Sequence, residues 1–199
     1  MKPFVFTVAL FCSLSIYAQT SGEKPVRKEI GNVSILSGLH QPILLKGGNI
    51  ALNYVTKKNI VLEASFGFGL KYTSLLSTED KEKFTTVESP FSYGFGVGYF
   101  WKGLNLLVEP KGTIFKMTDH QGKEETYTTF SVGLGAYYNI YLWKGLFLQP
   151  TVKFWPKVGS TLSSDGVEMQ NVSGQKYIHE ARTPGNNGLI YGASLGWTF

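Results

Sequence analysis

The end of the chain, residues 191–199 (YGASLGWTF), constrains its fold more than any other segment. Apolar side chains occupy every second position there, and the chain stops on an aromatic residue, Phe199. Successive side chains of a β-strand point to opposite faces, so this spacing predicts a strand with one continuous apolar face. The residues between are Gly192, Ser194, Gly196 and Thr198. Because they are small or polar, no second core can form on their side.

Three interior segments repeat this division of apolar and polar residues. From Leu62 to Tyr72 the even-numbered positions are apolar, whereas the odd-numbered positions include Glu63 and Lys71. Elsewhere, around residues 91–99 and 130–140, aromatic and aliphatic residues alternate mainly with serine and glycine. A soluble barrel would carry apolar residues inside and polar residues outside. Here we expect the polar face to point inward and the apolar face to meet lipid.

Turn signals divide the chain into eight segments of strand length. They are residues 31–41, 48–56, 60–76, 84–100, 105–118, 126–142, 146–158 and 188–199. Short and long links alternate between them, which is typical of an outer-membrane barrel with tight periplasmic turns and longer outside loops. The sequence therefore predicts an all-β fold, an eight-stranded antiparallel transmembrane β-barrel with up-and-down meander order, over residues 31–199.

Two prolines fit this pattern badly. Pro110 and Pro150 each remove a backbone donor inside a strand that has two neighbours. A bulge or a local irregularity is expected at each of them.

The N-terminus has the layout of a secretory signal peptide, residues 1–18. Lys2 precedes an apolar run, and Ala18 is the expected cleavage position. Residues 19–30 would then form a periplasmic segment. The only cysteine, Cys12, leaves with the signal peptide, so the mature chain has no thiol. Loss of Lys2 lowers the net charge of +5 by one, and the remaining charge is scattered, which argues against nucleic-acid binding.

The C-terminal strand closely resembles the C-terminal signal of bacterial outer-membrane β-barrels, in which the barrel assembly machinery reads the terminal phenylalanine. On that resemblance the assembly signal comprises Tyr191, Leu195, Trp197 and Phe199. Together with the signal peptide, the chain resembles small outer-membrane β-barrel domain proteins of the Bacteroidota type, similar in build to eight-stranded adhesion and anchoring barrels. The resemblance implies export to the outer membrane of a Gram-negative bacterium, with outer-membrane lipid around the barrel. That family is functionally mixed, so the task itself is not specified.

Five charged residues are expected to point into the lumen. They are Glu63, Lys71, Glu109, Lys111 and Lys153. Eight strands leave an interior about wide enough for side chains to fill, and buried charges of both signs are costly unless they pair. These residues therefore predict an ion-paired plug that keeps the barrel closed. A small conducting pore is the alternative.

The longest link, residues 159–187, is the best candidate for contact with another molecule. It combines serine, asparagine and glycine for flexibility with Tyr177, His179 and Arg182 for contact. The partner would be an envelope protein or a host-surface protein. The expected function is a non-catalytic, structural or surface-exposed barrel.

A lipid A-modifying enzyme, either a deacylase or an acyltransferase, is the alternative from another class. It would use His40 or His179 near the outer rim. No His-x-Ser pairing occurs on a predicted strand, however, so no catalytic residue is assigned. The sequence carries no cysteine and histidine cluster, phosphate loop or acidic calcium loop, and neither a metal nor a cofactor is expected.

Overall fold

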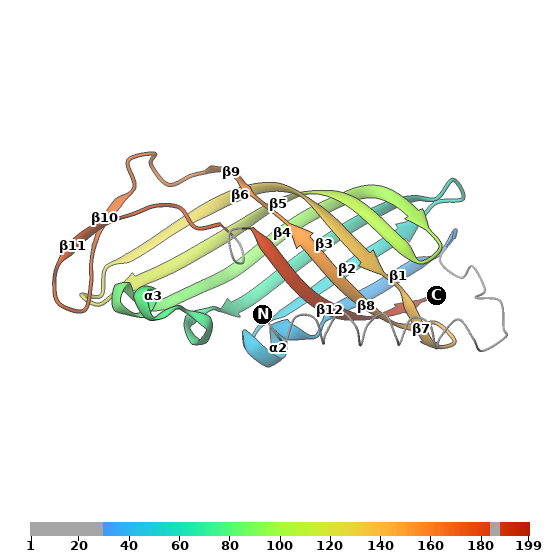
Figure 1. Ribbon diagram of the computed structural model, residues 1–199, viewed down its shortest axis with the longest axis horizontal. Helices are drawn as coiled ribbons and strands as arrows, with labels where there is room; N and C mark the ends of the chain where they lie inside the picture. Colours follow the sequence, from blue (N-terminus) through green and yellow to red (C-terminus); the bar gives the residue numbers. More distant parts are fainter. Residues whose placement is uncertain (1–29, 184–187) are drawn as a thin grey trace, which may run out of the picture.

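The strands of the protein close into one antiparallel barrel (Figure 1). The computed structural model describes residues 30–183 and 188–199. The barrel strands are β1 (Val33–Gly38), β2 (Gly48–Val55), β3 (Ile60–Lys71), β4 (Phe84–Trp101), β5 (Leu104–Asp119), β6 (Glu124–Tyr138), β7 (Ile140–Trp143), β8 (Leu146–Phe154), β9 (Lys157–Ser160) and β12 (Leu189–Thr198). Because β7 continues β6 and β9 continues β8, the wall has eight strands in meander order. This confirms the predicted eight-stranded barrel.

The last strand closes the wall. β12 pairs with β8 over nine residue pairs and with β1 over five. Across the second of these seams the side-chain oxygens of Ser34 and Thr198 lie 2.9 Å apart in a hydrogen bond. A closed wall pairs the backbone groups of its strands with one another, which is the condition for crossing a hydrocarbon layer with strands.

The outer surface of the barrel is a band of apolar side chains. Outward-facing Phe95 and Leu134 are 60% and 64% exposed, and Phe199 at the end of the chain is 68% exposed. The same face carries Leu62, Phe66, Phe68, Val97, Tyr99, Leu106, Val108, Tyr191, Leu195 and Trp197. Water-soluble monomers rarely expose a continuous apolar surface of this kind. A transmembrane β-barrel presents such a surface to lipid.

No helix in the described part of the chain is long and apolar enough to cross a membrane.

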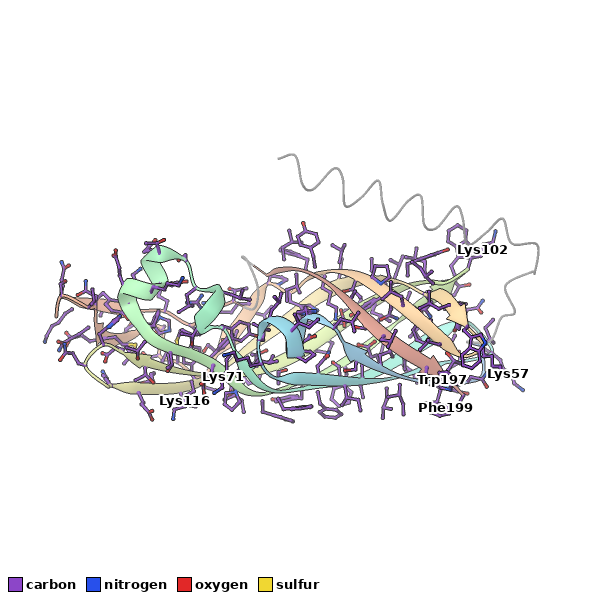
Figure 2. All side chains as sticks on the ribbon, turned by 90° about the horizontal axis from the view of Figure 1, so that it is seen from below. Lys57, Lys71, Lys102, Lys116, Trp197 and Phe199 are labelled. Atoms are coloured by element: carbon purple, nitrogen blue, oxygen red, sulfur yellow. The ribbon has the colours of Figure 1, made fainter. Side chains whose placement is uncertain are left out.

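The two ends of the barrel differ. Short turns connect β2 to β3, β4 to β5 and β7 to β8 at one end, where Figure 2 shows Lys57, Lys102 and Phe199. In the turn between β4 and β5, Lys102 and Gly103 have φ of 48° and 91°, as a tight two-residue hairpin requires. The other end carries η1 (Thr73–Leu75), α3 (Thr78–Lys83), and the hairpin of β10 (Val167–Gln170) and β11 (Lys176–His179). The link from β1 to β2 contains α2 (His40–Leu44), which lies nearer the middle of the long axis (Figure 1).

The predicted alternation of faces along the third strand fails beyond Gly69. That alternation predicts Leu70 and Tyr72 on the lipid face and Lys71 in the lumen, but Leu70 and Tyr72 point inward and Lys71 points outward. Gly69 has φ of 62°, a conformation that favours glycine. The facing part of β4, around Pro90, has one extra residue relative to β5. A shift of one residue moves every later side chain to the opposite face.

Pro110 and Pro150 do not cause the expected bulges. The pairing of β5 with β6 runs through Pro110 without a register shift, and the pairing of β12 with β8 runs through Pro150. Near Pro150 the irregularity is limited to the facing strand, where Asn139 separates β6 from β7 while the register on β8 is kept. Register shifts lie instead at Pro90 in β4 and where Phe130 and Ser131 of β6 face β9.

An outer cap extends the barrel on the side opposite the short turns. We use this name for α3 and the β10–β11 hairpin together with the outer ends of β4, β5 and β6. Its core contains Leu76, Phe84, Val87, Phe115, Met117, Tyr127 and Met169. The connection over residues 159–187, for which the sequence predicts flexibility, is thus in its described part a folded hairpin that buries Met169 completely.

The expected signal peptide, residues 1–18, lies outside the described residues. The same holds for the expected periplasmic segment up to residue 29. Ile30, the last residue of that segment, is described. It forms an isolated bridge with Val55 and packs against a buried cluster near the short turns that contains Val55, Val61 and Phe100. Both assignments stay predictions.

The face assignment can be tested at Phe95. Phe95→Lys places a charge near the middle of the apolar band, and we expect it to lower the free energy of unfolding in liposomes by about 2 to 4 kcal/mol. Phe95→Leu keeps the position apolar and is the matched control. Urea titration of both variants, followed by the heat-dependent gel shift of folded barrels, measures the difference. Equal stability of the two variants would contradict the assignment.

Candidate functional site

The half of the lumen next to the short turns is filled with side chains. Val55, Val61, Phe100, Leu107 and Tyr137 form one buried cluster there. A second buried cluster contains Leu36, Ala51 and Phe147. The amide of Gln149 donates to Asn139 Oδ1 at 2.9 Å, and the space left between these polar groups has no room for a water molecule. Among the described residues, side chains therefore fill the cross-section of this half at the level of Gln149 and Phe147.

Two buried glutamates lie at the middle of the lumen. Glu109, only 3% exposed, accepts hydrogen bonds from the Tyr137 hydroxyl and, at 3.2 Å, from Trp155 Nε1. Glu63 accepts from Asn53 Nδ2 at 3.3 Å. The carboxylates are therefore satisfied by neutral donors, which are the partners that a buried acceptor needs.

Two lysines lie beside these glutamates without a direct ion pair. Lys111 Nζ lies 4.1 Å from the centre of the Trp155 ring, and Lys153 Nζ lies 4.8 Å from that ring and 4.7 Å from the Tyr137 ring. Contacts of this kind are cation–π interactions. Within the part of the chain that the structure describes, neither ammonium group has a carboxylate within 4.0 Å. Among the residues that the structure describes, the hydrogen-bond donors of both ammonium groups have no acceptor.

The ion pairs expected among these charges are not formed in the described residues, and the closing role of the plug stays a prediction. Four of its five residues, Glu63, Glu109, Lys111 and Lys153, are brought together in the lumen by the barrel. Lys71 is not among them, because it faces outward beyond the bulge and pairs with Glu88 at 3.7 Å. Sequence reasoning missed Trp155, which contacts Glu109 and both lysines.

A cavity of about 540 Å³ lies between this charged layer and the outer connections. Lys111, Lys153 and Glu63 line it on the lumen side, and Leu70, Tyr72 and Trp155 give it apolar walls. Volumes between about 300 and 1,000 Å³ are those of small-molecule sites. The protein therefore combines a filled half with a hollow half.

The three residues expected to make contacts in the loop take part in the packing of the outer cap. Tyr177 donates from its hydroxyl to the Lys83 carbonyl at 3.1 Å, and Arg182 pairs with Asp80 at 3.0 Å. His179 is buried, with Nε2 lying 3.1 Å from the Tyr127 hydroxyl. Binding of an envelope or host-surface protein through residues 159–187 stays a prediction, but these three side chains already have partners within the cap.

Asp119, at the outer end of β5, ties the hairpin to the barrel. Its carboxylate accepts backbone hydrogen bonds from Gln121, Lys123 and Gln170, each at 2.9 Å. Burial alone would raise the pKa of Asp119, but the three N–H donors outweigh it and hold the pKa below its usual value. Sequence reasoning had no signal for this role beyond an acid at a strand end.

The histidines do not form a catalytic arrangement in the described residues. His40 lines the cavity, His120 Nε2 lies 2.9 Å from the Lys81 carbonyl, and His179 bonds to Tyr127. In residues 30–183 and 188–199 no histidine is hydrogen-bonded to a serine or a carboxylate, and no group of three metal-ligating side chains occurs. Triad chemistry requires a base within hydrogen-bond reach of its nucleophile.

Comparisons with known proteins add a structural likeness. No protein-family model matches the sequence, and no curated protein sequence matches it either. A solved structure with a similar course of the chain is that of a major outer membrane protein from Thermus thermophilus. It is 13% identical, with a TM-score of 0.44 and coverage of 84% of this chain and 98% of that one. The fold assignment rests on the strand pairing of the protein itself.

The role of Glu109 can be tested by removing its carboxylate. Glu109→Ala leaves the Tyr137 hydroxyl and the Trp155 indole without their acceptor, and we expect a loss of about 2 to 4 kcal/mol in the free energy of unfolding. Glu88→Ala removes an acid of the exposed pair with Lys71 and should change stability by less than about 0.5 kcal/mol. Urea unfolding in the same lipid compares the two. A small effect of Glu109→Ala would mean that the lumen contacts are dispensable.

The outer cap should loosen in acid. Burial, followed by the positive charge of Arg182, lowers the pKa of His179 from 6.5 to about 4. In an unfolded cap His179 binds a proton below about pH 6.5, whereas in the folded cap it binds one only below about pH 4. The stability that the neutral His179 contributes is therefore complete above pH 6.5 and is lost as the pH falls from there toward 4. Amide-exchange protection factors in β10 and β11 should drop accordingly. His179→Gln should abolish that pH dependence, and an unchanged dependence in this variant would assign it to another group.

Proposed function

We propose that the protein is a non-catalytic integral outer-membrane barrel that is sealed toward the periplasm and holds a ligand-sized cavity in its outer half. The single observation that carries this proposal is the division of the lumen into a filled half and a hollow half. A filled cross-section argues against a pore. A cavity of small-molecule size argues for binding rather than for a purely structural barrel.

The placement in the outer membrane rests on the wall of the barrel. Its apolar outer band, its short turns at one end and its longer connections at the other are the features of barrels in that membrane. The short turns and the C-terminal Phe199 would then face the periplasm, and the cap would face the outside. The outward row that ends in Trp197 and Phe199 is exposed, so it is available to assembly machinery.

Two measurements on the same protein test the proposal. Reconstituted in planar bilayers, the protein should give no large, steady single-channel currents, because its periplasmic half is filled. Mass spectrometry of lipid A from cells with and without the protein should show the same acyl content. Steady currents would favour a pore, and altered acyl content would favour the lipid-modifying enzyme.

A further inference from the structure

The floor of the cavity carries positive charge that the protein does not neutralise by direct contact. Lys111 and Lys153 both line the cavity, and their ammonium groups rest on aromatic rings rather than on carboxylates. The nearby Glu109 is already engaged by two neutral donors. Ammonium groups in a confined space gain most from a charged acceptor. The arrangement is therefore suited to an anion placed between the two lysines.

The charged side chains around the cavity balance in number but not in their contacts. Three positive residues, Lys111, Lys153 and Arg182, line it, and they face Glu63 and Asp80 on the lining and Glu109 beside the two lysines. Asp80 and Arg182 form an ion pair at 3.0 Å, so these two charges neutralise each other. Among the other described residues that line the cavity, only Lys111 and Lys153 carry positively charged groups whose hydrogen-bond donors have no acceptor.

Three buried polar atoms around the same cavity have no hydrogen-bond partner within the described residues. They are His40 Nδ1, Gln41 Oε1 and Thr113 Oγ1. Buried polar atoms are nearly always satisfied in folded proteins. Three further atoms in this state, Asn53 Oδ1, Asn105 Oδ1 and Ser131 Oγ, belong to residues that do not line this cavity. Beside the first three the cavity offers space in which a polar group or water can satisfy them.

Apolar residues line the cavity toward the side of the barrel, whereas Asp80 and Arg182 line it at the cap. The ladder between β1 and β12 ends at Gly38 and Ser194, and α2 follows where β1 would otherwise continue along β12 (Figure 1). Leu44 of α2 and Leu189 and Tyr191 of β12 line the cavity and are also exposed on the outer surface. The cavity therefore runs from the two lysines to the apolar band of the wall.

We propose that this cavity binds one single-chain amphiphile with an anionic headgroup. The headgroup lies between Lys111 and Lys153, and the acyl chain follows the apolar walls toward the side opening between α2 and β12. This inference rests on the proposed binding function and names its ligand class. A ligand of this class enters from the outer leaflet without crossing the filled half of the lumen.

The test uses the purified protein, freed from detergent in the mass spectrometer, with hexadecanoate as the probe. We expect one bound hexadecanoate per barrel. Lys153→Met and Lys111→Met should each weaken that binding about tenfold or more, since each removes a charged hydrogen-bond donor. Lys71→Met is the matched control, because this lysine is exposed on the outer surface. It should bind as the unaltered protein does.

Two further probes separate the chain from the headgroup. The neutral glycerol monohexadecanoate and inorganic phosphate should both bind more weakly than hexadecanoate. Binding of the neutral lipid at equal strength, or of phosphate alone at equal strength, would overturn the proposal. So would an unchanged affinity for hexadecanoate in both lysine variants.

A variant at the side opening keeps the proposal testable if the lysine variants do not fold. Leu44→Asp changes an exposed position of α2, and folding is checked by the heat-dependent gel shift. It should weaken hexadecanoate binding and leave the barrel folded, and unchanged binding would overturn the proposed position of the chain. If hexadecanoate does not bind and planar bilayers show no currents, only the ligand assignment is refuted. Steady currents would refute the sealed barrel itself.

Discussion

Closure of the strand ladder is the constraint on which the rest of the structure depends. In hydrocarbon no water can satisfy an open sheet edge, so the wall must join its last strand to its first. β12 meets this requirement by pairing with both β8 and β1. Once the wall is closed, alternation along each strand sends one row of side chains to the lipid and the next to the lumen. The contents of the lumen follow from this geometry.

Most of the wall could be predicted from the sequence because the period of two is a local property. The apolar row ending at Phe199 and the alternation around Phe95 both place side chains as the structure has them. The prediction failed where the period was broken. Gly69 and the bulge at Pro90 shift the alternation by one residue. Gly69 gives no distinct signal because glycine is frequent throughout these strands, and Pro90 carries the same signal as Pro110 and Pro150, where the register is kept.

Four of the five charged residues predicted in the lumen lie there, whereas Lys71 faces outward and the contacts could not be predicted. Counting by twos places Glu63, Glu109, Lys111 and Lys153 inside, because each lies on the inward row of its strand. Which of them meet depends on the relative heights of strands across the barrel, and that is set by the registers of all the strands between them. Trp155 contacts both lysines and Glu109 from the link between β8 and β9, and no feature of its neighbours in the sequence indicated this role. The cap was beyond prediction for a similar reason, since its hairpin is stabilised by residues distant in sequence, such as Asp119 and Tyr127.

The division of the lumen into a filled half and a hollow half is the central claim, and thiol accessibility tests it most directly. In a chain whose only cysteine, Cys12, is replaced, Ser65→Cys introduces a thiol that lines the cavity, and Asn105→Cys introduces one in the filled half. With the barrel in liposomes, a small water-soluble thiol reagent should modify the cysteine at position 65 and leave that at position 105 unmodified. Equal modification of both positions would contradict the account.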